Sequence, residues 1–128
     1  MSNKDLKIKN LSRNRFRELK YICLQYDELK QKLKELSIEN IKATIITGLP
    51  SGNSLSNPTQ DNVVRKLEIE RKVKAIEQAA IETDSELYSE IIKNVTNGIS
   101  PRYLFINCSE RKFYYLRRLF FSILDEKI

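Results

Sequence analysis

The sequence predicts an all-α protein, with a long antiparallel helix pair followed by a C-terminal helix-turn-helix-like unit. Apolar residues recur at three- and four-residue spacing in several segments, no strand pattern of useful length occurs, and one tract rich in Gly, Pro and Ser interrupts the helical pattern. We therefore expect a basic arm and a seam helix in residues 1–42, a linker in 43–57, and a helical domain in 58–128 whose helix-turn-helix occupies about 100–125.

The first predicted helix runs from about residue 12 to residue 36. Its apolar residues step by three and four, which forms a narrow seam of the coiled-coil type. The seam consists of Leu19, Ile22, Tyr26, Leu29, Leu33 and Leu36. Charged residues surround it, so it must be buried against another helix. Two partners satisfy that need: a helix of the same chain, which the shortness of the seam favours, or a second copy of the protein.

A connector separates this helix from the second one. Residues 48–58 hold two of the three glycines and two of the three prolines, so a helix cannot pass through them. Asn57 and Pro58 suit a helix start, and we expect a second helix over about 58–82. Its apolar stripe consists of Ile69, Val73, Ile76 and Ala80, broadened at the start by Val63, Val64 and Leu67.

The second helix should end where Thr83-Asp84-Ser85-Glu86 matches the pattern of a capping box. A bend without a break is the alternative. A third helix is expected from about 84 to 97, with Gly98 ending it. Its predicted buried residues are Leu87, Tyr88, Ile91, Ile92 and Val95.

The C-terminal segment has the order of elements that defines a helix-turn-helix. Ser100 and Pro101 suit the start of a short fourth helix at 101–106, residues 107–109 turn the chain, and Ser109 caps a longer fifth helix. In a helix-turn-helix the second helix enters the major groove of DNA. This order makes DNA binding the leading hypothesis.

The last predicted helix has two chemically different faces. The apolar face carries Phe113, Leu116, Phe120, Ile123 and Leu124. The polar face carries Arg111, Lys112, Tyr114, Tyr115, Arg117 and Arg118. Guanidinium, ammonium and phenol groups recognise phosphates and base edges. A solvated polar face on an ordinary amphipathic helix is the competing interpretation.

The charge of the chain is +6 and is unevenly distributed. Residues 1–20 contain seven basic and two acidic residues, whereas residues 77–92 contain five acidic residues and no basic one. Such asymmetry suits a polyanionic partner and orients the protein on it. Net charge alone does not distinguish a nucleic-acid binder from a basic protein of another kind.

Several classes of function lack support in the sequence. The chain has no histidine, so the usual general bases, triads and His-containing zinc sites are missing. Cys23 and Cys108 are far apart and form no metal or disulfide motif. No apolar run reaches the length of a membrane span. We expect no enzyme, no cofactor and no metal, no membrane partner, and a cytoplasmic protein.

Two short motifs resemble those of a known family. The first motif lies in the linker and consists of Leu49-Pro50-Ser51-Gly52 and Ser56-Asn57-Pro58-Thr59. The second lies near the C-terminus and consists of Arg102-Tyr103-Leu104 followed by residues 108–114. The first resembles the Met-Pro-x-Gly … Ser-Asp-Pro-Thr linker of small phage transcriptional regulators of the RinA/ArpU kind, and the second is similar to their C-terminal ending. The resemblance implies a helix-turn-helix similar to region 4 of sigma factors. It also implies a phage or prophage transcription regulator, an activator of late or packaging genes in the bacterial host.

The expected partner is double-stranded DNA, bound in a sequence-specific way. The predicted DNA-binding residues are Arg111, Lys112, Tyr114, Tyr115, Arg117, Arg118, Arg102 and Ser109. Arg111, Lys112 and Tyr115 should lie nearest the base edges. The basic residues before the first helix, with Arg13, Arg15 and Arg17 in its first turns, form either a second set of phosphate contacts or a solvated arm.

RNA polymerase and a second copy of the chain are the candidate protein partners. Phe121 falls outside the apolar stripe, so we expect it to be partly exposed and to mark such a contact. Two other functions remain open. One is the small subunit of a phage packaging motor, and the other is a helical adaptor that binds a protein through Phe120 and Phe121.

Overall fold

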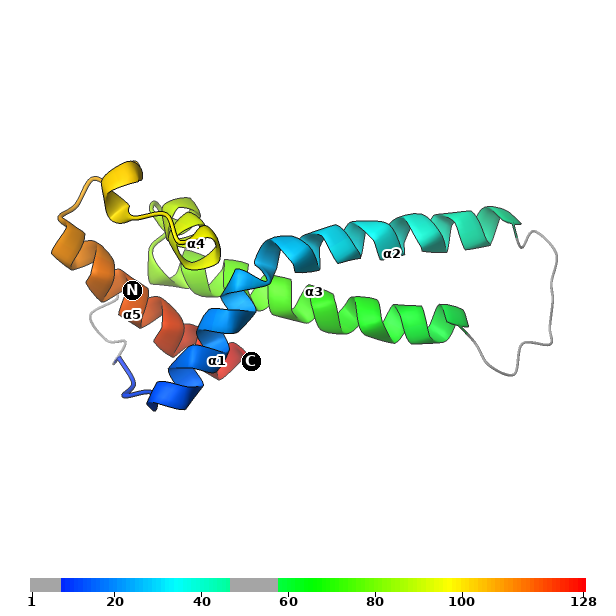
Figure 1. Cartoon of the computed structure of the whole chain (residues 1–128), viewed down its shortest axis with the longest axis horizontal. Helices are drawn as coiled ribbons and strands as arrows, with labels where there is room; N and C mark the ends of the chain where they lie inside the picture. The colour runs from blue at the N-terminus through cyan, green and yellow to red at the C-terminus, as the bar shows by residue number, and fades with distance from the viewer. Residues whose placement is uncertain (1–7, 47–57) are drawn as a thin grey trace.

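The computed structural model describes residues 8–46 and 58–128 (Figure 1). Its elements are α1 (Arg13–Leu24), α2 (Tyr26–Ile46), α3 (Pro58–Thr83), α4 (Tyr88–Asn97), the 3-10 turn η2 (Pro101–Tyr103) and α5 (Glu110–Lys127). These residues contain no strand, so the predicted all-α class is confirmed for them. The basic residues before position 8 and the linker motif at 49–57 lie outside the described residues.

Helices α2 and α3 form the long antiparallel pair, which projects from the rest of the molecule in Figure 1. Leu36 of α2 and Ile69 and Val73 of α3 are buried, and Leu29 and Leu33 are partly buried against them. The Tyr26 hydroxyl donates a hydrogen bond to Glu77 Oε2 at 2.7 Å and ties the base of the pair together. The seam is therefore buried against a helix of the same chain.

The first predicted helix is divided at Gln25. The Gln25 N–H is shared between the carbonyls of Tyr21 and Ile22, at 3.2 and 3.1 Å, so the last turn of α1 tightens toward 3-10 geometry. Figure 1 shows that α1 leaves the line of α2 at this point. The bend lets Leu19 and Cys23 enter the core around α3, while α2 follows α3 outward and continues to Ile46, beyond the predicted end.

The predicted break after α3 occurs, but the predicted capping box does not form. The Thr83 hydroxyl donates to the Ala79 carbonyl at 2.7 Å, within α3. The Asp84 carboxylate instead accepts the N–H groups of Glu86 and Leu87, at 2.8 and 2.9 Å. Because Asp84 makes this turn, α4 starts at Tyr88 rather than near residue 84. Gly98 ends α4 with φ of 68°, as expected.

The predicted short helix at 101–106 is wrong beyond its first turn. Ser100 caps a single 3-10 turn at Pro101–Tyr103, after which Leu104 adopts an extended backbone. From there Leu104, Ile106 and Cys108 pack against the core at every second position, a spacing that a helix could not provide. The chain therefore approaches α5 from α4 through an extended connector, and no two-helix unit with a tight turn forms within 100–125.

The main core lies where α1, α4 and α5 surround the C-terminal half of α3 (Figure 1). Ala79 and Ala80 of α3 are fully buried, and these small side chains allow neighbouring helices to approach closely. All five residues of the predicted apolar face of α5 are buried. Phe121 is also buried, which corrects the prediction that it is exposed. Since Phe120 and Phe121 are both inside, they form no adaptor surface.

Some residues predicted to be buried are exposed instead. Val63, Val64 and Leu67 are 42%, 53% and 59% exposed, because they lie on the side of α3 turned away from the Ile69–Val73 seam. Tyr88 is 39% exposed at the start of α4. The apolar stripe of α3 is thus narrower than the sequence suggested.

Candidate nucleic-acid interface

The polar face of α5 begins at a well-formed cap. The Ser109 Oγ accepts the N–H of Lys112 at 3.1 Å, which fixes the first turn of the helix. The hydroxyl of Ser109, predicted to contact DNA, therefore serves the helix itself. Beyond the cap, Arg111, Tyr115 and Arg118 follow at four- and three-residue spacing and are exposed, as are Lys112 and Tyr114. This stripe is opposite the buried face.

Arg117 differs from its neighbours and corrects the prediction that it belongs to the exposed face. Its guanidinium carbon lies 5.1 Å from the centre of the Phe121 ring and 5.8 Å from that of Phe16. Burial lowers the pKa of Arg117 below its ordinary value, although a guanidinium remains charged near neutral pH. Arg117 thus packs as a cation over two aromatic rings between α1 and α5.

Arg15 is also not available as a phosphate contact. Its Nε donates to Asp125 Oδ1 at 2.6 Å, and its Nη1 lies 3.7 Å from Glu18 Oε2. The Arg15 hydrogen bond holds the pKa of Asp125 below its ordinary value. The partners of Arg15 are acidic groups of the same chain, so only Arg13 and Arg17 of the predicted trio remain exposed and free of a described ion pair.

The basic segment before α1 is not a free arm from residue 8 onward. The Lys9 N–H donates to Ser122 Oγ at 2.9 Å, and the Lys9 ammonium lies 3.1 Å from Glu126. Ile8 and Leu11 are partly buried against the core. The segment therefore lies along the C-terminal half of α5 and fixes α1 beside it.

Helix α1 contributes an exposed basic face, of which the predicted trio Arg13, Arg15 and Arg17 covers only a part. Arg13, Arg17 and Lys20 follow one another at four- and three-residue spacing and are exposed. Tyr21, which is 63% exposed, adjoins them on the same side. The spacing of these residues can be seen in the sequence. The break at Gln25 and the packing of α1 against α5 cannot be seen there.

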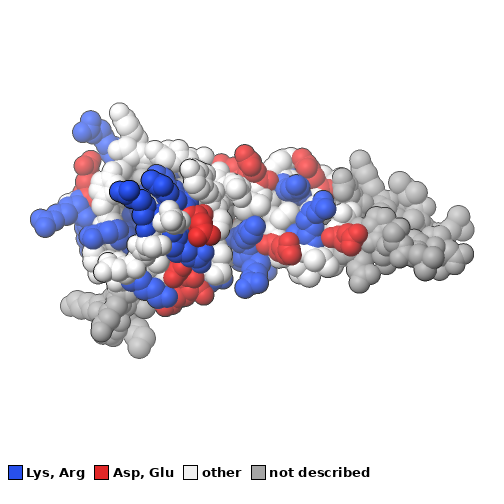
Figure 2. Space-filling view, turned by 60° about the horizontal axis from the view of Figure 1, so that its bottom comes forward, with Lys and Arg blue, Asp and Glu red and all other residues white. Residues whose placement is uncertain are grey.

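A groove joins the basic faces of α1 and α5. It encloses about 520 Å³. Its lining includes Lys9, Arg13, Phe16, Arg117, Arg118 and Phe121. Arg13 of α1 and Arg118 of α5 thus stand on one concave surface over an aromatic floor. Figure 2 shows many Lys and Arg side chains, with some Asp and Glu among them, at the end of the molecule that α1, α4 and α5 form.

We call the exposed cations of these two helices the α1–α5 basic surface. It consists of Arg13, Arg17 and Lys20 of α1 and Arg111, Lys112 and Arg118 of α5. Arg102, also exposed, lies in η2, which packs against α5. The acidic segment at 77–92 does not cover this surface, because most of its carboxylates have partners elsewhere: Glu77 with Tyr26, Glu82 with Lys127, Asp84 in its turn, and Glu90 with Lys93.

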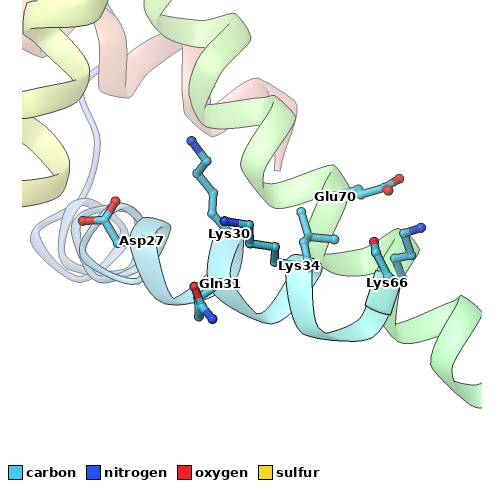
Figure 3. Close-up of a pocket in the computed structure, with 8 residues that line it drawn as sticks. Asp27, Lys30, Gln31, Lys34, Lys66 and Glu70 are labelled. Carbon is cyan, nitrogen blue, oxygen red and sulfur yellow. The ribbon is translucent and has the colours of Figure 1, made fainter. Parts of the chain in front are cut away.

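The α2–α3 pair has a different charge pattern. A cavity of about 570 Å³ lies between these helices (Figure 3). Its lining is mixed in sign, with Asp27 and Glu70 beside Lys30, Lys34 and Lys66. Mixed signs at this spacing largely cancel at a distance, so the pair offers no extended attraction to a polyanion.

No protein-family model, curated protein or solved structure matches this chain. Within the described ranges, every helix is too short or too polar to cross a bilayer.

Proposed function

We propose that this chain binds double-stranded DNA through the α1–α5 basic surface. The observation that carries the proposal is the groove in which Arg13 of α1 and Arg118 of α5 meet, because it brings exposed cations of two helices onto one surface. The six exposed cations of the α1–α5 basic surface attract a polyanion, whose counterions are released on binding. The mixed charges of the α2–α3 pair have no such effect.

The proposed docking places the N-terminal half of α5 in the major groove. A helix with side chains is about 10–12 Å across, and the major groove is about 12 Å wide. Arg111, Tyr115 and Lys112 then face base edges, where arginine can bind guanine through two hydrogen bonds. Arg118 and the cations of α1 contact phosphates on the flank of the groove.

The biological role we propose is transcription regulation in a phage or prophage, acting on late or packaging genes in the cytoplasm of a bacterial host. Its support is the resemblance of the two motifs to the RinA/ArpU kind of regulator. The extended connector before α5 replaces the supporting helix of a compact helix-turn-helix. The proposed DNA contact therefore depends on α1 as the second basic element.

The packaging-subunit alternative rests on a different observation. Val63, Val64 and Leu67 form an exposed apolar group on the projecting helix pair, which favours self-association. Light scattering on the purified protein separates the two roles. A ring-sized assembly supports the packaging subunit, and a monomer or dimer supports the regulator.

A binding titration tests the DNA proposal. Fluorescence anisotropy with a labelled duplex of mixed sequence compares the wild type with the triple variant R111A/K112A/R118A. We expect affinity to fall on the order of 100-fold at low salt, since three contacts to DNA are removed. The matched control is K32A/K34A/K72A, which removes the same charge from exposed positions on α2 and α3. Equal losses in both variants, or no binding by the wild type, would contradict the proposal.

A further inference from the structure

The connector before α5 presents two aromatic side chains to solvent. The side chain of Tyr103 is 74% exposed and that of Phe105 is 89% exposed. A phenyl ring this exposed gives up the free energy that burial would provide. A nearby core was available, because Leu104 and Ile106 on either side of Phe105 both pack against it.

The exposure of Phe105 follows from a fixed backbone. Residues 103–108 alternate, with Leu104, Ile106 and Cys108 turned inward and Tyr103, Phe105 and Asn107 turned outward. The Phe105 N–H donates to Oε2 of the buried Glu90 at 3.1 Å. Ser100 caps the preceding turn. The ring is thus held outward by contacts on both sides of it.

The surroundings of the two rings indicate what they contact. Arg102 is adjacent in sequence and exposed, and η2 packs against α5, whose first turn carries Arg111 and Lys112. Exposed aromatic rings that follow an exposed arginine, on a segment leading into a basic helix, complement a partner that combines negative charge with flat aromatic groups. Nucleic acid is such a partner, because its bases stack on aromatic side chains while its phosphates pair with arginine and lysine.

We propose that Phe105, with Tyr103 beside it, stacks on a base that leaves the helical stack at the edge of the DNA site bound by α5. Aromatic and apolar side chains inserted at a base step partly unstack it and bend the duplex. This proposal rests on the proposed function: α5 and α1 hold the DNA backbone, and the connector deforms it. It assigns to residues 103–105 a role in DNA distortion that the basic surface does not have.

A mismatch preference provides the test. A base in a mismatch is easier to unstack than one in a matched pair. We compare binding of a labelled duplex of mixed sequence with binding of the same duplex carrying one central mismatch. The wild type should prefer the mismatched duplex, and F105A should lose between about 5-fold and 100-fold in affinity for it. F105Y, which keeps a ring, should retain the preference, and I38A serves as a control at an exposed apolar side chain of α2.

The outcomes separate the two proposals. Equal binding of both duplexes by the wild type, unchanged in F105A, overturns base stacking while the basic surface stands. Absence of any binding at low salt overturns the proposed function and base stacking with it. A parallel assay measures binding to vesicles that contain phosphatidylserine. If F105A loses vesicle binding and the wild type shows no preference for the mismatched duplex, base stacking is overturned in favour of a membrane contact. Because the Phe105 ring is almost fully exposed, F105A should fold normally, which circular dichroism verifies.

Discussion

The Nε of Arg15 lies 2.6 Å from Oδ1 of Asp125, so the first turn of α1 is fastened to the last turns of α5. These two residues are 110 positions apart in the chain. Their side chains are only 30% and 19% exposed, which limits screening by solvent. The pair aligns the two helices whose outer faces form the α1–α5 basic surface.

We expect R15A to reduce stability rather than DNA binding. A partly shielded, charged hydrogen bond of this kind contributes about 1 kcal/mol, and R15A should lower the free energy of unfolding by roughly that amount. Urea denaturation measures the loss, and a double-mutant cycle with D125N isolates the pair. R13A is the matched comparison, because it should leave stability unchanged and weaken DNA binding. If R15A weakened DNA binding and R13A lowered stability instead, Arg15 and not Arg13 would be the residue that contacts DNA.

The Arg15–Asp125 pair predicts that the stability of the fold depends on pH. The hydrogen bond from Arg15 lowers the pKa of Asp125 in the folded state below its ordinary value of 3.8. A carboxyl group whose pKa is lower in the folded state than in the unfolded state stabilises the fold at pH values above its unfolded-state pKa. This stabilisation is lost as the pH falls through the folded-state pKa. The difference in unfolding free energy between the wild type and D125N should therefore shrink between about pH 5 and pH 3. A constant difference would mean that the charge of Asp125 is not what stabilises the fold.

Arg117 and Arg118 should behave differently although they are neighbours. R117A removes a guanidinium that packs over Phe16 and Phe121, so it should cost about 1–2 kcal/mol of stability and little DNA affinity. R118A removes an exposed cation, so it should weaken DNA binding and reduce the slope of log affinity against log salt by about 1. Thermal denaturation and salt-dependent titrations measure both. If R117A and R118A had the same effects on stability and on DNA affinity, the two side chains would lie in one environment, which would contradict the structure.

The two cysteines should differ in reactivity. Cys23 is fully buried, and burial raises the pKa of its thiol to about 12. Since the thiolate is the reactive form, iodoacetamide should modify Cys23 only after unfolding, whereas the partly exposed Cys108 should react in the native protein. Mass spectrometry of the native and urea-unfolded protein identifies the modified peptide. Rapid native modification of Cys23 would contradict the burial of α1 against α5.

The helices were predictable because each carries its own local signal. Three- and four-residue spacing located the seam of α2, the stripe of α3 and the apolar face of α5. Ser109 and Gly98 marked a start and an end by local capping. The break at Gln25 was not predictable in this way, since no Gly or Pro stands there and the apolar spacing runs through it.

The exposure of the candidate site residues was predictable in part. The exposed positions of Arg111, Lys112 and Arg118 follow from the period of α5 alone. The burial of Phe121, the packing of Arg117 and the pairing of Arg15 depend on contact with α1, which is distant in sequence. Phe105 was missed because a helix was expected at 101–106, whereas the alternation of Leu104, Ile106 and Cys108 fits an extended segment.

The measurement that tests the central claim most directly is a titration of the ¹⁵N-labelled protein with a short DNA duplex, followed by amide chemical shifts. We expect the perturbed amides to concentrate at 13–21 in α1, at 102–105 in the connector and at 109–118 in and before α5, while those of 27–37 in α2 stay unchanged. Perturbations centred on the α2–α3 pair, or none at low salt, would contradict it.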